Sequence, residues 1–238
     1  MTQLHGLIDS FRDMVAPRHC EACGCSMATI SVRSRLDFLC ATCSSTLKAP
    51  PREDELMQRL LRHCSQDDLS ISHFFSLMAV PHSSDMLNLI YSLKYRGMAR
   101  IGYELGYELG ATMKHFGYLD FEVIIPIPIH HARKRERGYN QADEISAGIA
   151  HSLHVPVAVS VIQRIKYTRT QTQMNAAERK NNVSGVFAPG ENSAAVFDKK
   201  VLLVDDVLTT GSTLNSCATA LLELGARQVN VATVAVAE

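Results

Sequence analysis

The sequence contains no tryptophan and has no net charge, since 24 Lys and Arg residues balance 24 Asp and Glu residues. A balanced chain has no general attraction to nucleic acid or to a membrane surface, so any such attraction must be local. No apolar run approaches the ~18 residues of a spanning helix. Acids and an arginine also interrupt the apolar positions of the first residues, unlike a secretory signal. We therefore expect a cytoplasmic protein without membrane insertion.

Cysteine is scarce as well, and its count of seven is odd, which argues against a scaffold of disulfides. The C-x-x-C spacing, repeated after an insert, is typical of two turns that hold one structural zinc ion. The predicted ligands are Cys20, Cys23, Cys40 and Cys43. His19 or Cys25 could replace one of the first pair, and a redox-active C-x-x-C or a chance cluster is the alternative. We predict a small N-terminal zinc ribbon whose folding depends on Zn²⁺.

With 238 residues, 46% of them apolar, the chain is long enough for one large domain or for a medium and a small one. We expect a helix and the ribbon in residues 1–50, a linker helix and a hood or edge strand in 51–82, and a larger domain in 83–238. The larger part alternates between helical and strand patterns, which is typical of an α/β fold with a mostly parallel sheet flanked by helices. The strand candidates there are Val123–Ile129, Val157–Ile162, Val201–Val204 and Gln228–Val236.

Three glycines, Gly102, Gly106 and Gly110, lie four residues apart within a helical pattern. Each costs ~1 kcal/mol relative to alanine in a helix interior. We expect close packing of this helix against the sheet to offset that cost.

The sharpest motif is VLLVDDVLTTGST at Val201–Thr213, in which a buried strand leads into Asp205 and Asp206. A loop of hydroxyls and one glycine then opens a helix. The free N–H groups and partial positive charge of a helix N-terminus bind phosphate without any Lys or Arg. The candidate phosphate-binding residues are Thr209, Thr210, Gly211, Ser212 and Thr213. The two carboxylates would repel phosphate, so we expect them to face sugar hydroxyls.

The first half of this motif also resembles the start of a receiver domain, but that interpretation leaves TTGST unexplained and places the motif too late in the chain. The whole string resembles the signature by which type I phosphoribosyltransferases bind 5-phosphoribosyl 1-pyrophosphate (PRPP). In such an enzyme, C1 of PRPP loses pyrophosphate as positive charge develops on the ring, and catalysis is mostly positioning and charge stabilisation. Asp205 and Asp206 would be the catalytic residues, with Mg²⁺ bridging pyrophosphate and ribose oxygens.

A pyrophosphate site requires basic residues, because arginine suits bidentate contact with phosphate oxygens. Between Pro128 and Lys180 there are nine Lys or Arg and four Asp or Glu, a local charge of +5. The stretch Arg164–Phe187 has the composition of a mobile lid. Taken singly, each stretch could be a solvated surface. The candidates for contact with pyrophosphate and for the lid are His130, Arg133, Arg135, Arg137, Arg164, Lys166 and Arg179.

These motifs, in this order, resemble the ComF family. The resemblance also covers YSLKYRG at Tyr91–Gly97, the run PIPIHHARKRERGYNQ, and a series that begins RxKxTxxQxxM at Arg164. Lys166 and Met174 depart from the family, which commonly has Arg and Leu there, but the basic character of the lid is kept.

The resemblance implies a type I phosphoribosyltransferase fold with a hood and a flexible loop, and a role in natural competence, DNA uptake and the processing of internalised single-stranded DNA. It implies PRPP, single-stranded DNA and the competence machinery as partners and pentosyl transfer from PRPP as the activity, but it identifies no acceptor. The alternative is a non-catalytic DNA-binding accessory protein that uses the PRPP site as a sensor. In that case Tyr91, Tyr95 and Tyr139 are available for stacking on bases.

Overall fold

The computed structural model describes residues 18–27, 36–81, 84–95, 98–166 and 185–237. The helices in these ranges are α2 (Ala41–Ser45), α3 (Glu53–Leu61), α4 (Met86–Tyr95), α5 (Ala99–His115), α6 (His131–Arg137), α7 (Gln141–Leu153) and α9 (Ser212–Glu223). The strands are β1 (Phe74–Val80), β2 (Val123–Pro126), β3 (Ile162–Arg164), β4 (Phe187–Pro189), β5 (Lys200–Leu208) and β6 (Gln228–Ala237). Single 3-10 turns lie at Gln66–Asp68 and Ser193–Val196.

The main sheet has the order β1-β6-β5-β2, and every neighbouring pair is parallel. Leu203 in β5 lies beside Val231 in β6, and Leu202 lies beside Ile124 in β2. The two central strands consist largely of valine, leucine and alanine with almost no exposure, as expected of strands covered on both faces. Because parallel strands all end at one edge, the segments that follow β2 and β5 meet there.

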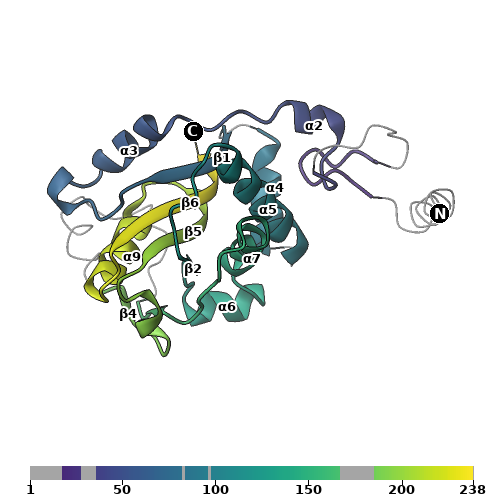
Figure 1. Ribbon diagram of the computed structural model, residues 1–238. Coiled ribbons are helices and arrows are strands. Elements are labelled where there is room, and N and C mark those ends of the chain that lie inside the picture. The colour runs from purple at the N-terminus through teal and green to yellow at the C-terminus, as the bar shows by residue number, and fades with distance from the viewer. Residues whose placement is uncertain (1–17, 28–35, 82–83, 96–97, 167–184, 238) are drawn as a thin grey trace.

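Helices cover both faces of this sheet (Figure 1). One core joins α4, α5 and α7 to one face, with Leu89, Leu105 and Ile145 fully buried. The other core joins α3 and α9 to the opposite face around Leu60 and Leu221. The predicted architecture, a mostly parallel α/β sheet flanked by helices, is confirmed.

The three glycines of α5 face a helix, and the expectation that they pack against the sheet is wrong. An added Cβ at Gly106 would lie 2.1 Å from the carbonyl oxygen of Ile145 in α7. Gly148 of α7 approaches as closely, since its Cβ would lie 2.0 Å from the oxygen of Tyr103. Glycine lets the two helix backbones approach closely, which compensates for its low helix propensity.

The predicted strand Val157–Ile162 is also wrong in its extent. Val157 forms only an isolated bridge to Ile124, and the chain then leaves the sheet. Ser160 has a φ of 61°, in the left-handed region that a strand does not contain. Strand structure resumes at Ile162 as β3, which pairs with β4 in a separate antiparallel ribbon.

Several predictions fall outside the described residues, including the N-terminal helix and the lid between 167 and 184. The predicted edge strand is found as β1, which pairs with β6. Among the helices in the described ranges, none combines the length and the hydropathy required to cross a bilayer.

Candidate functional site

The acidic pair lies inside β5, which continues past it to Leu208. Successive side chains of a strand point to opposite faces, so Asp205 and Asp206 are directed to different sides of the sheet. Asp206 is directed toward the face covered by α4, and it is 8% exposed. Asp205 is directed toward the face covered by α9, where its charge acts on Arg164 and Cys217. The two carboxylates therefore meet different neighbours.

Lys94, the penultimate residue of α4, forms an ion pair with Asp206, with 3.1 Å between Nζ and Oδ2. Both side chains are largely buried, with 27% of the lysine and 12% of the aspartate exposed. Such shielding from water makes the pair stronger than a surface ion pair. Lys94 was not among the predicted site residues. The only feature of the sequence that could have identified Lys94 is its place in the motif YSLKYRG, at the end of an amphipathic helix.

Burial is the main cause that raises the pKa of Asp205, to about 7, and the negative charge of Asp206 raises it further. Three groups act in the opposite direction. The backbone N–H of Asp206 donates to Oδ1 of Asp205 at 2.9 Å, and the positive charges of Lys94 and Arg164 favour the ionised form. Asp205 is thus a carboxyl that changes its charge near neutral pH.

The predicted phosphate loop leads directly into α9. Gly211 is the N-cap, with a φ of 76° that favours glycine. The hydroxyls of Thr210 and Ser212 lie 3.2 Å apart and are half-buried, whereas Thr209 is exposed. Leu60 of α3 packs against the loop, since a Cβ on Gly211 would lie 2.0 Å from its Cδ2. The predicted linker helix therefore forms one wall of this loop.

The predicted basic segment follows β2 as helix α6. His130 is its N-cap, with Nδ1 accepting from the N–H of Ala132 at 3.3 Å. Burial lowers the pKa of His130, and the nearby positive groups, among them Arg133 and Arg135, lower it further. Arg137 lies at the other end of the helix, where Nη1 donates to Oε1 of Gln141 at 2.9 Å.

Arg164, the last residue of β3, interacts electrostatically with both Asp205 of the acidic pair and Arg133 of the basic helix. It is half-buried, and its Cζ lies 5.9 Å from the centre of the Phe187 ring. Burial and the charge of Arg133 lower the pKa of Arg164, whereas Asp205 raises it. Of the two other predicted lid residues, Lys166 is exposed and Arg179 lies outside the described residues.

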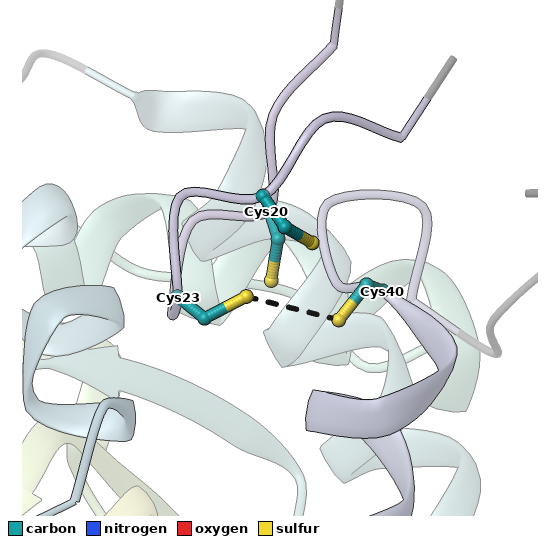
Figure 2. A group of neighbouring side chains, drawn as sticks. Cys20, Cys23 and Cys40 are labelled. Atoms are coloured by element: carbon teal, nitrogen blue, oxygen red, sulfur yellow. Dashed lines mark hydrogen bonds between the residues drawn. The ribbon is translucent and has the colours of Figure 1, made fainter. Parts of the chain in front are cut away.

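The N-terminal cysteines form a cluster whose sulfur atoms all lie within 4.8 Å of one another, made of Cys20, Cys23, Cys25 and Cys40. Figure 2 shows the sulfurs of Cys23 and Cys40 directed at each other, 3.9 Å apart. Zinc–sulfur bonds of about 2.3 Å in a tetrahedron require sulfurs about 3.8 Å apart. The donor set and its spacing therefore fit zinc.

Cys43, the fourth predicted ligand, is a buried neighbour of this group. Its backbone N–H donates to Sγ of Cys40 at 3.4 Å, which makes Cys40 the cap of α2. The same N–H is the largest cause that lowers the pKa of Cys40, to about 6. Among the sulfurs of the first knuckle, Cys23 has a lowered pKa and Cys25 a pKa raised to about 12. Cys25 lies within the four-sulfur cluster, and the thiol of Cys43 interacts with those of Cys20, Cys23 and Cys40, so both are candidates for the fourth ligand.

The cysteine module packs on α4. Asn88 donates through Nδ2 to the carbonyl of Ala22 at 2.8 Å, and Ser92 donates to Oε2 of Glu21 at 3.0 Å. Leu39 and Leu36 of the module are buried in the same core as α4. One helix therefore contacts both the cysteine module and, through Lys94, the acidic pair.

The model of the phosphoribosyl transferase domain family matches residues 137–237. "Competence protein F" of Haemophilus influenzae is 39% identical over 110 residues, which are 46% of this chain and 48% of that protein. "Competence protein ComFC" of Bacillus subtilis is 29% identical over 150 residues, 60% of this chain and 56% of that protein. These matches support the predicted resemblance to the ComF family.

The chain is also similar to "DNA utilization protein YhgH" of Escherichia coli K12, at 33% identity over 108 residues, 45% of this chain and 46% of that protein. The chain spans about half the length of the curated relatives it matches.

Solved phosphoribosyltransferase structures are more distant. A purine phosphoribosyltransferase from Pyrococcus horikoshii has a TM-score of 0.35 and 20% identity, covering 56% of this chain and 71% of its own. A PRPP amidotransferase from Bacillus subtilis has a TM-score of 0.38 and 22% identity, covering 55% and 26%.

Proposed function

We propose that this chain is a member of the ComF family and that it binds PRPP at the carboxyl edge of β5 and β2. The observation that carries the proposal is the acidic pair in β5, followed at once by the glycine-capped start of α9 and flanked by basic α6 at the end of the neighbouring strand. This order of groups matches a pentose that carries phosphate at one end and pyrophosphate at the other.

In this proposal the 5-phosphate lies against the backbone N–H groups and hydroxyls of Thr209–Thr213. Asp205 contacts the ribose hydroxyls from the face of α9, and Asp206 does so after releasing Lys94. The pyrophosphate is held by His130, Arg133, Arg135 and Arg137 of the α6 segment, with Arg164, Lys166 and Arg179 from the lid.

Carboxylate and phosphate oxygens are hard donors that suit Mg²⁺. Asp205 and Asp206 would hold it directly or through water, and its charge would help to neutralise the departing pyrophosphate. The residues of the chain would position C1 and stabilise the positive charge that develops on the ring, which is how a phosphoribosyltransferase acts. We propose pentosyl transfer as the activity and leave its acceptor open.

We also propose that the protein acts in natural competence, on internalised single-stranded DNA in the cytoplasm, because its relatives carry the names competence protein F and DNA utilization protein. The exposed basic side chains of α6 are suited to phosphate contacts with a strand. The cysteine cluster supports a structural Zn²⁺, held by Cys20, Cys23 and Cys40 with either Cys25 or Cys43.

A second candidate is a protein that senses PRPP while binding DNA without catalysis. The ion pair between Lys94 and Asp206 favours it, because PRPP would have to displace a contact that links the site to α4. Titration with PRPP in the presence and absence of single-stranded DNA discriminates the two, since a sensor requires one ligand to change the affinity of the other.

The test of PRPP binding is calorimetry on the full chain with Mg²⁺. We expect the double variant Asp205→Asn, Asp206→Asn to lose binding while its thermal unfolding stays cooperative. Asp120→Asn, Asp198→Asn is a matched control, because both of these aspartates are exposed and lie away from the loop. Equal affinity in the wild type and the site variant would reject the assignment. DNA binding is tested by its decline with salt, which PRPP binding should not share to the same degree.

A further inference from the structure

Five of the seven cysteines gather in the N-terminal module, whereas a closed structural zinc site takes only four ligands. The sulfurs of Cys20, Cys23 and Cys40 lie within 4.8 Å of one another and form the centre of the group (Figure 2). Cys25 lies within the same distance of all three, and the thiol of Cys43 interacts with each of them. A zinc ion held by the central three and by one of these two therefore leaves one thiol uncoordinated beside the metal.

The two candidates for the fourth ligand differ in their access to solvent. Cys43 is buried, within α2 and in the same core as α4. Its backbone N–H donates to Sγ of Cys40 at 3.4 Å, so these two cysteines form a closed turn of the kind that holds zinc. Cys25 is exposed. Burial and the spacing to Cys40 favour Cys43 as the fourth ligand, which leaves Cys25 as the uncoordinated thiol.

The backbone holds Cys25 against the cluster. His19 and Ser26 form an antiparallel bridge, and inside it the N–H of Cys20 donates to the carbonyl of Cys25 at 2.9 Å. Gly24 lies in the turn that closes this small hairpin, with a φ of 74°, and a Cβ added there would meet no atom within 4 Å. The thiols on either side of this glycine are both exposed, so a small reagent can reach them from solvent.

An exposed thiolate beside a second thiol is the arrangement in which a peroxide produces a disulfide. Cys23 is a thiolate when it binds zinc. Its sulfur attacks one oxygen of hydrogen peroxide, the O–O bond breaks, hydroxide leaves, and Cys23 becomes a sulfenic acid. The thiol of Cys25 then attacks the sulfur of Cys23, the S–O bond breaks, water leaves, and an S–S bond forms. The two sulfurs together lose two electrons, which the peroxide gains.

We propose that Cys25 is an oxidisable fifth thiol of the zinc site, and that a peroxide joins it to Cys23 in a disulfide that releases the metal. The sulfur of a disulfide is no longer a thiolate ligand, so Cys20, Cys40 and Cys43 alone would remain where a structural site requires four ligands. A dithiol reductant reverses the reaction by thiol–disulfide exchange. The proposal goes beyond PRPP binding and does not depend on it.

The test uses the full zinc-loaded chain, hydrogen peroxide as the oxidant, and a chromogenic chelator that reports released zinc. Mass spectrometry of alkylated peptides then maps the disulfides. The wild type should release its zinc and form the disulfide between Cys23 and Cys25. Cys25→Ser should bind zinc as the wild type does before oxidation, and should then release it about tenfold or more slowly. Cys64→Ser, which removes a thiol outside the cluster, is the matched control and should behave as wild type.

Recovery of zinc by the oxidised wild type, after a dithiol reductant and Zn²⁺ are added, supports a reversible disulfide. Loss of zinc from Cys25→Ser before any oxidant is added would show that Cys25 is a ligand, and it overturns the proposal. The proposal is also overturned by an oxidised wild type that lacks this disulfide, or by equal rates of zinc release in Cys25→Ser and the wild type. Neither readout involves PRPP, so a failure here is distinct from a failure of the proposed function.

Discussion

Lys94 and Asp206 form a shielded ion pair between the end of α4 and the carboxyl end of β5, two residues before Leu208. It gives the two acids of the motif different electrostatic surroundings, because Asp205 faces the other side of the sheet, near Arg164. A ligand that requires both carboxylates must therefore compete with Lys94 for Asp206, whereas the positive charge of Arg164 favours the ionised form of Asp205.

Lys94→Gln removes a positive charge that lowers the pKa of Asp205. We expect that pKa to rise above 7, and the pH midpoint of PRPP binding to rise by about one unit. The measurement is calorimetric PRPP affinity across pH. Lys114→Gln, in the last turn of α5, is the control and should leave the midpoint unchanged. An unaltered midpoint in Lys94→Gln would show that the pair has no electrostatic role in the site.

Asp205→Asn should stabilise the folded protein at alkaline pH. In the wild type, folding raises the pKa of Asp205 from 3.8 to about 7. The free energy of unfolding of the wild type therefore falls as the pH rises through this range, and it stays reduced above it. The variant has no carboxyl at this position, so its stability does not fall over this pH range. We expect it to exceed the wild type by at most about 4 kcal/mol at pH 8, with the difference shrinking toward pH 4. Urea unfolding at both pH values measures it, and a pH-independent difference would contradict the raised pKa.

Gly106→Ala should destabilise the fold by roughly 1–3 kcal/mol, because the new Cβ would meet the backbone of Ile145. Gly102→Ala in the same helix is the control, since the nearest atom to its Cβ would be Cβ of Glu144 at 3.1 Å and not a backbone atom. There the gain in helix propensity, about 1 kcal/mol, opposes one tight contact, since the other two neighbours, Leu93 and the carbonyl of Gln141, would lie at 3.6 and 3.8 Å. Chemical denaturation of the two variants should therefore give clearly different midpoints, and equal midpoints would show that α5 and α7 can separate without cost.

Cys20→Ser and Cys40→Ser should each lose bound zinc, because both sulfurs belong to the four-cysteine cluster. Cys64→Ser should keep it, since that thiol lies beyond α3 and donates to the carbonyl of Leu60. Elemental analysis of purified protein measures the metal. Comparison of Cys25→Ser with Cys43→Ser identifies the fourth ligand, and full zinc in Cys20→Ser would reject the site.

Much of the fold could be predicted from local pattern. The valine- and leucine-rich runs of β5 and β6 are apolar on both faces, which is the mark of a central parallel strand. The segment after Val157 has the same composition, but it leaves the sheet at Ser160 because of a backbone conformation that composition does not encode.

Contacts between distant residues could not be predicted. The glycines of α5 predict that another segment approaches this helix closely, but its identity, the part of α7 around Gly148, depends on the tertiary fold. The same holds for Lys94, whose pairing with Asp206 follows from where α4 lies on the sheet. The two C-x-x-C motifs predicted a metal cluster, whereas the nearness of Cys25 depends on the turn at Gly24, which has a φ of 74°.

The short helix α4 holds the cysteine module with Asn88 and Ser92 and reaches Asp206 with Lys94. In the proposed function, a chelator that removes the metal from the cysteine cluster would therefore act, through α4 and Lys94, on Asp206. The metal content of the cysteine cluster and the affinity for PRPP would then be coupled through one helix.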